Sequence, residues 1–393
     1  MIPTGHAPAS ICYVTTTSVT LSAFVVESAK FLAEEGGFGI AMAAAEDIEF
    51  AESLPKTISY HAVPMSRGID PWAPRAIWSL VKLFRHEHFD LVQFSTPNAA
   101  LYAAVAAFVA RVPVRVYAQW GIRYVGFRGF RRKIFKAVEK ITCLLATHVE
   151  PDSHGNLEFA VAQGLYPRRK GYVIWQGSAC GVDLARFDIS RAATWRLEVR
   201  EELGLGKDDF VFGFVGRLSR DKGGDELLTA ARTYFRGDQS ARLLVVGGLE
   251  SLGMDPELMD WMQREPRVVL CGPTRAVARY LAAMDVLVHP SYREGFGLVI
   301  AEAQAMGLPA IVTAIPGPLD AVIPNETAIV IPPRDPSALR RALGALAADD
   351  GLRSRMGIAA HEWSRNNFDS RIFRRHLLER RIGQLSAAER RGK

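Results

Sequence analysis

The sequence has few cysteines, and they are scattered along the chain. The four stand at Cys12, Cys143, Cys180 and Cys271, and no two of them form a CxxC pair. This spacing excludes a disulfide framework and the common kinds of zinc site, and it indicates a reducing compartment.

Long hydrophobic runs are also absent. The most apolar helical pattern, residues 99–110, is too short to span a bilayer and ends at Arg111 and Pro113. The first residues lack the basic and apolar regions of a signal peptide. We therefore expect a cytoplasmic protein, and peripheral binding to the inner face of a membrane stays open.

Motifs and charge that would indicate other functions are missing too. The chain has neither a GxGxxG fingerprint nor a P-loop, which argues against a nicotinamide dehydrogenase and an ATPase. His86 and His88 stand two positions apart, so they do not share a helical face and predict no metal site. The net charge of +6 favours anionic ligands or an anionic membrane surface, but it is too small to indicate a nucleic-acid partner.

What the sequence does have is a repeated alternation of short apolar runs and helical patterns. The predicted strands of the first half are residues 11–14, 38–43, 58–63, 91–94, 114–117, 148–149 and 173–175. Those of the second half are residues 210–215, 243–246, 268–270, 286–289, 310–313 and 328–331. This alternation predicts an α/β fold with a doubly wound parallel sheet in each half.

We expect two domains of this kind, because 393 residues exceed the usual size of one domain. The first covers residues 1–190 and includes predicted helices over residues 21–35, 74–86 and 130–145; the second covers residues 191–362. The carboxyl edges of the two sheets are expected to face a ligand cleft. The Arg-rich tail, residues 363–393, is either a helix that packs back across the first domain or a solvated end.

The stretch from Pro290 to Ala303 follows a predicted strand and opens a predicted helix. Its glycines let the backbone approach a ligand closely, and free N–H groups at the helix start attract anions. Glu294 would repel a phosphate unless it faces hydroxyl groups instead. The stretch therefore favours a phosphorylated, hydroxyl-rich ligand such as a nucleotide sugar. An ordinary helix start with a solvated Glu294 is the alternative.

Two cations follow the first predicted strand of the second domain. Arg217 comes directly after Gly216, and Lys222 stands five positions later, on a loop at the carboxyl edge of the sheet. Such a pair can neutralise a diphosphate, because arginine is a bidentate fork and lysine a point charge. A solvated basic turn paired with Asp221 is the alternative. The Glu294 loop is predicted at the same edge, which favours the functional interpretation.

Together, Gly216-Arg217…Lys222-Gly223 and Glu294-Gly295-Phe296-Gly297…Glu302 resemble the signature of the family 4 glycosyltransferases. These are retaining enzymes of the GT-B fold, in which two Rossmann-like domains face a cleft. The seven residues between the glutamates match that family's paired-Glu motif. In the first domain, residues 14–17, 63–67 and 177–183 resemble bacterial capsule, exopolysaccharide and O-antigen members, which build glycans on a polyprenyl-diphosphate carrier.

The resemblance implies a role for each matching residue. Arg217 and Lys222 would hold the donor diphosphate, Glu302 would bind the ribose hydroxyls, and Glu294 would contact the donor sugar. The other residues expected in the donor site are Gly216, Gly295, Phe296, Gly297 and Leu298, with Pro273 and Thr274 where the family holds the base. No metal or other cofactor is expected. A front-face attack without a covalent intermediate is a hypothesis that the retaining family suggests.

The first domain departs from the family in two loops. Many members carry a glycine-rich loop after the first strand, whereas this chain has Thr15-Thr16-Thr17-Ser18. Thr17 is therefore expected to contact the acceptor through its hydroxyl group or backbone. Trp120 stands about where many members have a histidine, and it is either a platform for a sugar or a buried aromatic residue.

A basic cluster with interleaved aromatic and aliphatic residues follows Trp120. Its members include Arg123, Arg128, Arg131, Arg132 and Lys133. Such a segment can rest on anionic headgroups or receive a lipid diphosphate. A solvated charged helix face is the alternative, and a nucleic-acid partner is not expected because no recognised module surrounds the cluster.

These features predict a hexosyl- or N-acetylhexosaminyltransferase that uses a nucleotide sugar, most readily a UDP-sugar. Its expected acceptor is a polyprenyl-diphosphate-linked saccharide of a capsule or O-antigen pathway, at the inner face of the membrane. The sequence does not specify the sugar, the base, the acceptor, the linkage or the oligomeric state. A nucleotide-sugar epimerase or hydrolase of the same fold and a non-catalytic glycan-binding partner are the alternatives. Because a non-catalytic partner is free to lose Glu294, Arg217 and Lys222, their presence favours the enzyme.

Overall fold

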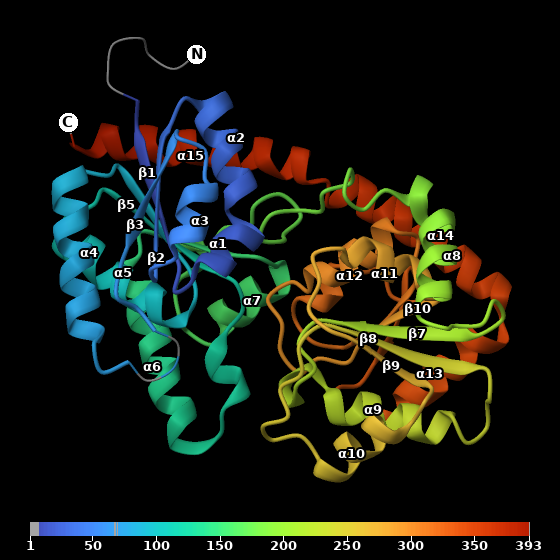
Figure 1. The fold of residues 1–393 in the computed structure, drawn as a ribbon. Helices are drawn as coiled ribbons and strands as arrows, with labels where there is room; N and C mark the ends of the chain where they lie inside the picture. Colours follow the sequence, from blue (N-terminus) through green and yellow to red (C-terminus); the bar gives the residue numbers. More distant parts are fainter. Residues whose placement is uncertain (1–7, 67, 69, 393) are drawn as a thin grey trace. The chain divides into compact units, whose positions relative to one another are not determined.

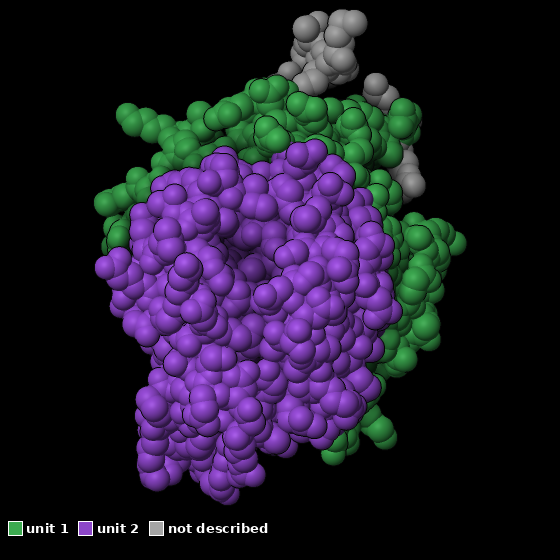
Figure 2. Space-filling view, turned by 90° about the vertical axis from the view of Figure 1, so that its right-hand side faces the viewer, with its two compact units in different colours: residues 1–180, 371–393 green, residues 181–370 purple. Residues whose placement is uncertain are grey.

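The computed structural model describes residues 8–66, 68 and 70–392. The chain divides into two compact units, which Figure 2 draws in different colours. The first unit consists of Met1–Cys180 together with Arg371–Lys393, and the second of Gly181–Ser370. The first unit is therefore assembled from two separate segments of the chain.

A six-stranded parallel sheet forms the centre of the first unit. Its strands are β1 (Ser10–Val14), β2 (Gly39–Ala44), β3 (Ile58–Ala62), β4 (Leu91–Phe94), β5 (Val114–Gln119) and β6 (His148–Pro151). They lie in the order β3-β2-β1-β4-β5-β6, and Tyr13 of β1 pairs with Met42 on one side and Gln93 on the other. The strands are short apolar runs because both faces of a parallel sheet are covered by helices.

Helices cover both faces of the first sheet (Figure 1). They are α1 (Ser18–Phe24), α2 (Val26–Gly36), α3 (Ile48–Ser53), α4 (Ala73–Glu87), α5 (Pro97–Val109), α6 (Gly129–Leu145), α7 (His154–Ala162) and α15 (Ser370–Gly392). One hydrophobic cluster joins the sheet to α1, α2 and α15, and another joins it to α4, α5, α6 and α7. None of the helices described in either unit is long and apolar enough to cross a bilayer.

Two local predictions in the first unit are wrong. The helix expected over residues 21–35 consists of α1 and α2, which meet at Val25, where the backbone departs from helical geometry (φ −116°). No strand forms at residues 173–175, where the pairing is limited to an isolated bridge between Gly171 and Val149. The left-handed backbone of Trp175 (φ 51°) and Gly177 (φ 104°) turns this segment away from an extended path.

The second unit repeats the architecture of the first. Its strands are β7 (Phe210–Val215), β8 (Ala241–Val246), β9 (Val268–Cys271), β10 (Val286–His289), β11 (Ala310–Thr313) and β12 (Ala328–Ile331), in the order β12-β11-β10-β7-β8-β9. Its helices are α8 (Ala192–Glu202), α9 (Gly224–Tyr234), α10 (Pro256–Arg264), α11 (Val277–Ala283), α12 (Leu298–Ala305), α13 (Pro336–Ala348) and α14 (Asp350–Asn367). Figure 1 shows α9 and α10 on one face of the sheet and α11 and α12 on the other.

The boundaries between the two units differ from the predicted domain ends at residues 190 and 362. The chain enters the second unit at Gly181 and leaves it after Ser370. Both connecting segments are held within the second unit, because the Val182 amide donates to the Phe368 carbonyl at 2.6 Å and the Ser370 amide donates to the Val182 carbonyl at 2.9 Å. Beyond Ser370, helix α15 belongs to the first unit, where Phe373 and Leu377 lie in the hydrophobic core. The tail is thus a packed helix of the first unit.

Each sheet has one place where the order of its strands reverses. In the first sheet this switch point lies between β1 and β4, and in the second between β7 and β10. The loops that follow these strands lead to opposite faces of the sheet and leave a crevice at its carboxyl edge, where ligands bind in open α/β sheets. The two switch points are therefore the first places to look for a site.

Candidate functional site

The switch point of the second unit brings together the two loops that the sequence singles out. The Asp221 carbonyl, in the loop after β7, accepts a hydrogen bond of 3.0 Å from the Tyr292 amide, in the loop after β10. Gly223 (φ 75°) makes the close approach possible, because a Cβ atom there would lie 2.1 Å from the Pro290 carbonyl oxygen. The sequence predicted that these loops share an edge, and the structure places them in direct contact.

Glu294 lies at the centre of this crevice. Its Oε1 atom accepts hydrogen bonds from Lys222 Nζ at 2.5 Å, His289 Nε2 at 2.7 Å and Ser291 Oγ at 3.1 Å. Only 12% of its side chain is exposed. Burial by itself would raise the pKa of Glu294, but the Lys222 ammonium and the bond from His289 hold that pKa well below its ordinary value. The carboxylate is therefore ionised and fixed in place.

His289 and Ser291 are members of this cluster that the sequence reasoning missed. His289 is the last residue of β10 and is buried. From the sequence, we predict only that it belongs to the strand over residues 286–289. Its position was the available signal, since the last residue of a central strand lies at the edge where ligands bind.

Arg217 is held apart from the Glu294 cluster. Half of its side chain is exposed, and it forms ion pairs with Glu250 and, at 3.9 Å, with Asp221. Asp221 also accepts from Ser219 Oγ at 2.6 Å and from Arg293 at 3.1 Å. Both predicted diphosphate ligands, Arg217 and Lys222, are thus paired with carboxylates in this ligand-free structure.

The loop between the two glutamates leads into the start of α12. Gly297 (φ 84°) is its N-cap and provides no side-chain cap, so the first amides of the helix, beginning with Leu298, are available to an anion. Gly295 is packed backbone to backbone against Gly317, where a Cβ atom would lie 2.3 Å from the Gly295 carbonyl oxygen. The side chain of Phe296 is 2% exposed, so it anchors the loop in the core and offers no surface to a ligand.

Glu302 lies on α12, and its side-chain carboxyl group has no hydrogen-bond or ion-pair partner among the described residues. Burial raises its pKa to about 7, and Arg186 opposes that rise only in part. A half-buried carboxyl group without donors around it is suited to receive hydroxyl groups, which would donate to it. This environment is compatible with the role of ribose ligand that the family resemblance implies for Glu302.

The remaining predicted donor residues lie along the same carboxyl edge. Gly216 is bonded to the neighbouring strand, since its amide donates to the Val246 carbonyl at 2.8 Å. Pro273 and Thr274 follow β9; Pro273 is exposed, and the Thr274 hydroxyl accepts from the Ala276 amide at 3.0 Å.

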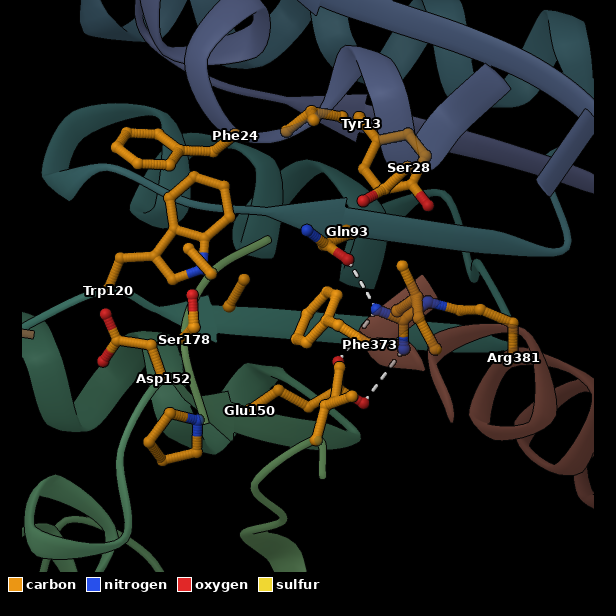
Figure 3. A pocket seen from close by; sticks show the side chains of 16 residues that line it. Tyr13, Phe24, Ser28, Gln93, Trp120, Glu150, Asp152, Ser178, Phe373 and Arg381 are labelled. Atoms are coloured by element: carbon orange, nitrogen blue, oxygen red, sulfur yellow. Dashed lines mark hydrogen bonds and ion pairs between the residues drawn. The ribbon is translucent and has the colours of Figure 1, made fainter. Parts of the chain in front are cut away.

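In the first unit, Trp120 lines a small cavity near the carboxyl edge of the sheet (Figure 3). The cavity has room for about 30 Å³, enough for about two water molecules but not for a sugar ring. Trp120 is half-buried and packs on Phe24, with ring centroids 5.4 Å apart. Asp152 and Ser178 lie near it in the same cavity. The ring of Trp120 is thus partly packed and partly accessible, so it matches neither the fully buried residue nor the open sugar platform that the sequence predicts as alternatives.

The other residues predicted for the acceptor or membrane lie on the loops and helices of this unit. Thr17 is half-buried at the N-cap of α1. Arg123 is half-buried, with its guanidinium 4.8 Å from the centroid of the Phe135 ring. The four further cations, at the start of α6, are exposed: Arg128, Arg131, Arg132 and Lys133.

Metal-ligating residues do not gather in the described part of the chain, where no group of three or more His, Cys, Asp or Glu side chains could hold an ion. This is a statement about the arrangement of the side chains. The absence of a metal from the reaction stays a prediction.

Comparison with known proteins identifies relatives of both units. Residues 196–363 match the family described as "Glycosyl transferases group 1". The capsular polysaccharide biosynthesis glycosyltransferase CapM of Staphylococcus aureus is 30% identical over 314 residues, which are 79% of this chain and 82% of CapM. The D-inositol 3-phosphate glycosyltransferase of Xylanimonas cellulosilytica is 37% identical over 194 residues, which are 47% of this chain and 46% of that protein.

Solved structures share the fold at lower identity. HepE of Anabaena, solved in complex with UDP, gives a TM-score of 0.76 at 20% identity, over 95% of this chain and 100% of HepE. WaaG, which is described as a glycosyltransferase involved in lipopolysaccharide biosynthesis, gives a TM-score of 0.73 at 17% identity, over 94% of this chain and 98% of WaaG. Because the identities are low, these likenesses show the GT-B fold alone.

Proposed function

Because this chain belongs to the group 1 glycosyl transferases, which are family 4 enzymes of the GT-B fold, we propose that it transfers a sugar from a UDP-sugar to a lipid-linked saccharide. The enzyme class and the fold follow from the comparisons, and the donor and acceptor are our proposal. The observation that carries the proposal is the ionised Glu294 beside Lys222 at the switch point of the second unit.

The proposed reaction begins with an exchange of ionic partners. The donor diphosphate draws Lys222 from Glu294 and Arg217 from Glu250, since a diphosphate carries more negative charge than one carboxylate. The uncapped amides of α12 add further positive charge. These groups stabilise the charge that develops on the leaving UDP, which is the main electrostatic requirement of the transfer.

The two glutamates then contact the neutral parts of the donor. Glu294, released by Lys222, accepts hydrogen bonds from hydroxyl groups of the sugar, while Glu302 accepts from the ribose. Transfer with retention is the outcome that the family implies, by attack on the same face as the departing diphosphate. A glycosyl adduct trapped on Glu294 would contradict this form of the mechanism.

Two properties of known proteins support the choice of donor and pathway. The structure of HepE holds UDP, and CapM is named for capsular polysaccharide biosynthesis. By analogy we assign this chain a UDP-sugar and a role in the assembly of a surface polysaccharide, on the cytoplasmic side of the membrane.

Helix α6 supports a membrane-bound acceptor. It exposes Phe130 (77%), Ile134 (46%) and Leu144 (74%) together with cations such as Arg131 and Arg132. Exposed apolar side chains with flanking cations suit a surface that offers both acyl chains and anionic headgroups. The helix would hold the enzyme at the membrane where a polyprenyl-diphosphate acceptor lies.

A transfer assay tests the proposal. Purified protein is supplied with UDP-, GDP- or ADP-linked sugars, with and without a membrane extract that contains lipid-linked saccharides, and nucleotide release is measured. The proposal expects UDP release that depends on the extract, with the sugar found in the lipid fraction. Equal release without the extract would indicate a hydrolase, and nucleotide binding without release would indicate a non-catalytic partner.

A vesicle assay tests the membrane part separately. The double variant R131E/R132E is expected to lose sedimentation with anionic vesicles of phosphatidylglycerol and phosphatidylethanolamine. The matched control is R340E/R341E, which makes the same change of charge at exposed positions of α13. Equal binding by both variants would remove α6 from the proposed membrane surface.

A further inference from the structure

We propose that His289 is a positioning residue for Glu294, which it holds in place when Lys222 turns to the donor. The inference rests on the proposed donor site and adds a residue to which neither the sequence reasoning nor the family resemblance gives a role. It starts from the three hydrogen bonds that meet at one oxygen of Glu294.

The contacts define the direction of the bond from His289. A carboxylate can only accept, so the 2.7 Å contact between His289 Nε2 and Glu294 Oε1 requires a proton on Nε2. The other ring nitrogen, Nδ1, is buried and has no hydrogen-bond partner among the described residues. A second proton on Nδ1 would be a buried donor without an acceptor, which is unfavourable. His289 therefore donates its Nε2–H to Glu294.

The three donors differ in how easily they can leave. The Lys222 side chain is more accessible than that of His289, with 24% of it exposed against 4%. Its long, flexible side chain can swing to a phosphate. His289 is short and stands on β10, where its backbone pairs with Val312 of the neighbouring strand β11. A diphosphate can attract the Lys222 side chain away, whereas the His289 side chain is short and almost fully buried and its backbone is fixed in the sheet, so it has little freedom to leave Glu294.

The consequence concerns the charge and orientation of Glu294 during the reaction. Once Lys222 has left, a buried carboxylate without a donor would take up a proton or turn toward solvent. The bond from His289, assisted by Ser291 at 3.1 Å, keeps it ionised and directed. Lys222 thus holds Glu294 before the donor binds, and His289 holds it after Lys222 has moved to the diphosphate.

A pair of substitutions at position 289 tests this role. His289→Leu removes the donor with little change of volume, and His289→Gln keeps an amide N–H near the position of Nε2. We expect His289→Leu to lower kcat about 10- to 100-fold, the effect of one hydrogen bond to a charged group, with the donor KM changed less than about threefold. His289→Gln should restore most of kcat.

The control is His361→Leu, which removes another histidine of the second unit. Its Nδ1 atom lies 2.8 Å from the Ala305 carbonyl oxygen, away from the loops after β7 and β10. We expect its kcat to stay within about threefold of the wild type. The proposal is wrong if folded His289→Leu keeps its kcat, if its KM rises in step with the loss of kcat, or if His289→Gln does not restore activity.

A measurement without substrate separates this inference from the proposed function. His289→Leu is combined with Lys222→Met, and the melting temperatures of the two single variants and the double variant are compared. We expect His289→Leu to cost more in the Lys222→Met background, where the strong bond from Lys222 to Glu294 is already lost. Additive losses would contradict the inference even if transfer occurs. A coupled loss would support it even if no donor is turned over.

Discussion

The two switch points of the molecule have the same topology and different chemistry. At the first, between β1 and β4, Thr16 Oγ1 lies 2.8 Å from Thr96 Oγ1, and the Thr16 amide donates to the same Thr96 oxygen at 3.0 Å. At the second, between β7 and β10, an ionised Glu294 is held by Lys222 and His289. The contacts described at the first switch point are therefore between neutral hydroxyl groups, and those at the second are between charged groups.

The comparison shows that the order of the strands determines where a binding site can form, and that the side chains determine which ligand it can bind. Hydroxyl groups that bond to one another can exchange those bonds for the hydroxyl groups of a neutral ligand at little cost. Cations that are paired with carboxylates can instead be recruited by an anion. The second crevice is thus suited to the donor diphosphate. The predictions below test this division, from the largest expected effect to the smallest.

The largest effect is expected at the carboxylate of the charged crevice. Glu294→Gln keeps the shape of the side chain but removes its charge, so sugar transfer should fall about 1,000-fold while affinity for UDP changes less than about threefold. Single-turnover transfer and calorimetric binding of UDP measure the two quantities. Glu326→Gln, at an exposed loop position, is the control. An equal loss of transfer and of UDP affinity would assign Glu294 to folding or nucleotide binding.

A smaller effect is expected at the cation of the same crevice. Lys222→Ala should weaken the binding of UDP about 10- to 100-fold, because one charge-assisted contact to the diphosphate is lost. Thr16→Val, at the equivalent place of the first unit, should leave UDP affinity unchanged. Calorimetry at low and high salt measures both variants. If Thr16→Val weakens UDP as much as Lys222→Ala does, the division between the two crevices is wrong.

A several-fold effect is expected at Trp120 of the first unit. Trp120→Ala removes a half-buried ring and should raise the KM for the lipid-linked acceptor about three- to tenfold, without a change in UDP affinity. Trp78→Ala, at a ring that is 56% exposed in the same unit, is the control. An unchanged acceptor KM would show that Trp120 serves packing alone.

The smallest effect is expected in the stability of the ligand-free protein. The pKa of Glu302 is about 7 in the folded state, above its ordinary value of 4.5, so the folded state holds this proton more tightly. The stability from this group is present at low pH and is lost as the pH rises through the window from 4.5 to about 7. Glu302→Gln should therefore raise the melting temperature by a few degrees at pH 8 and have little effect at pH 4.

The outcome at the two pH values is decisive for Glu302. An equal shift of the melting temperature at pH 4 and pH 8 would mean that the substitution acts through packing and that the carboxyl group is not perturbed. Glu362→Gln, at an exposed position of α14, provides a comparison.

The strands and the edge of the donor site could be predicted because buried parallel strands are continuous apolar runs. Phe210–Val215 and Val286–His289 stand out in this way, and knowing that each strand ends at the same edge was enough to bring Lys222 and Glu294 together. The pairing of Lys222 with Glu294 itself was not predicted, because the spacing of residues does not say which charges satisfy one another before a ligand arrives.

Other features depended on contacts that a local pattern does not contain. His289 looks like any residue at the end of a buried strand, and Phe296 looks like part of a ligand loop although its ring packs against Phe368 at a centroid distance of 5.1 Å. The Arg-rich tail looked as much like a solvated end as like a packed helix. Its burial depends on a pairing between Arg381 and Glu150, which are 231 positions apart.

That pairing has a consequence for how the first unit can be made. Arg381 donates to both carboxylate oxygens of Glu150, at 3.0 and 2.9 Å, and to Gln93 at 2.6 Å (Figure 3). Although burial alone would raise the pKa of Glu150, Arg381 keeps it below its ordinary value. A fragment that ends at residue 180 would lose the partner of this carboxylate together with Phe373 and Leu377, which lie in the hydrophobic core of the unit. An isolated first unit should therefore be built as a circular permutant, or reconstituted by adding residues 371–393 as a separate peptide.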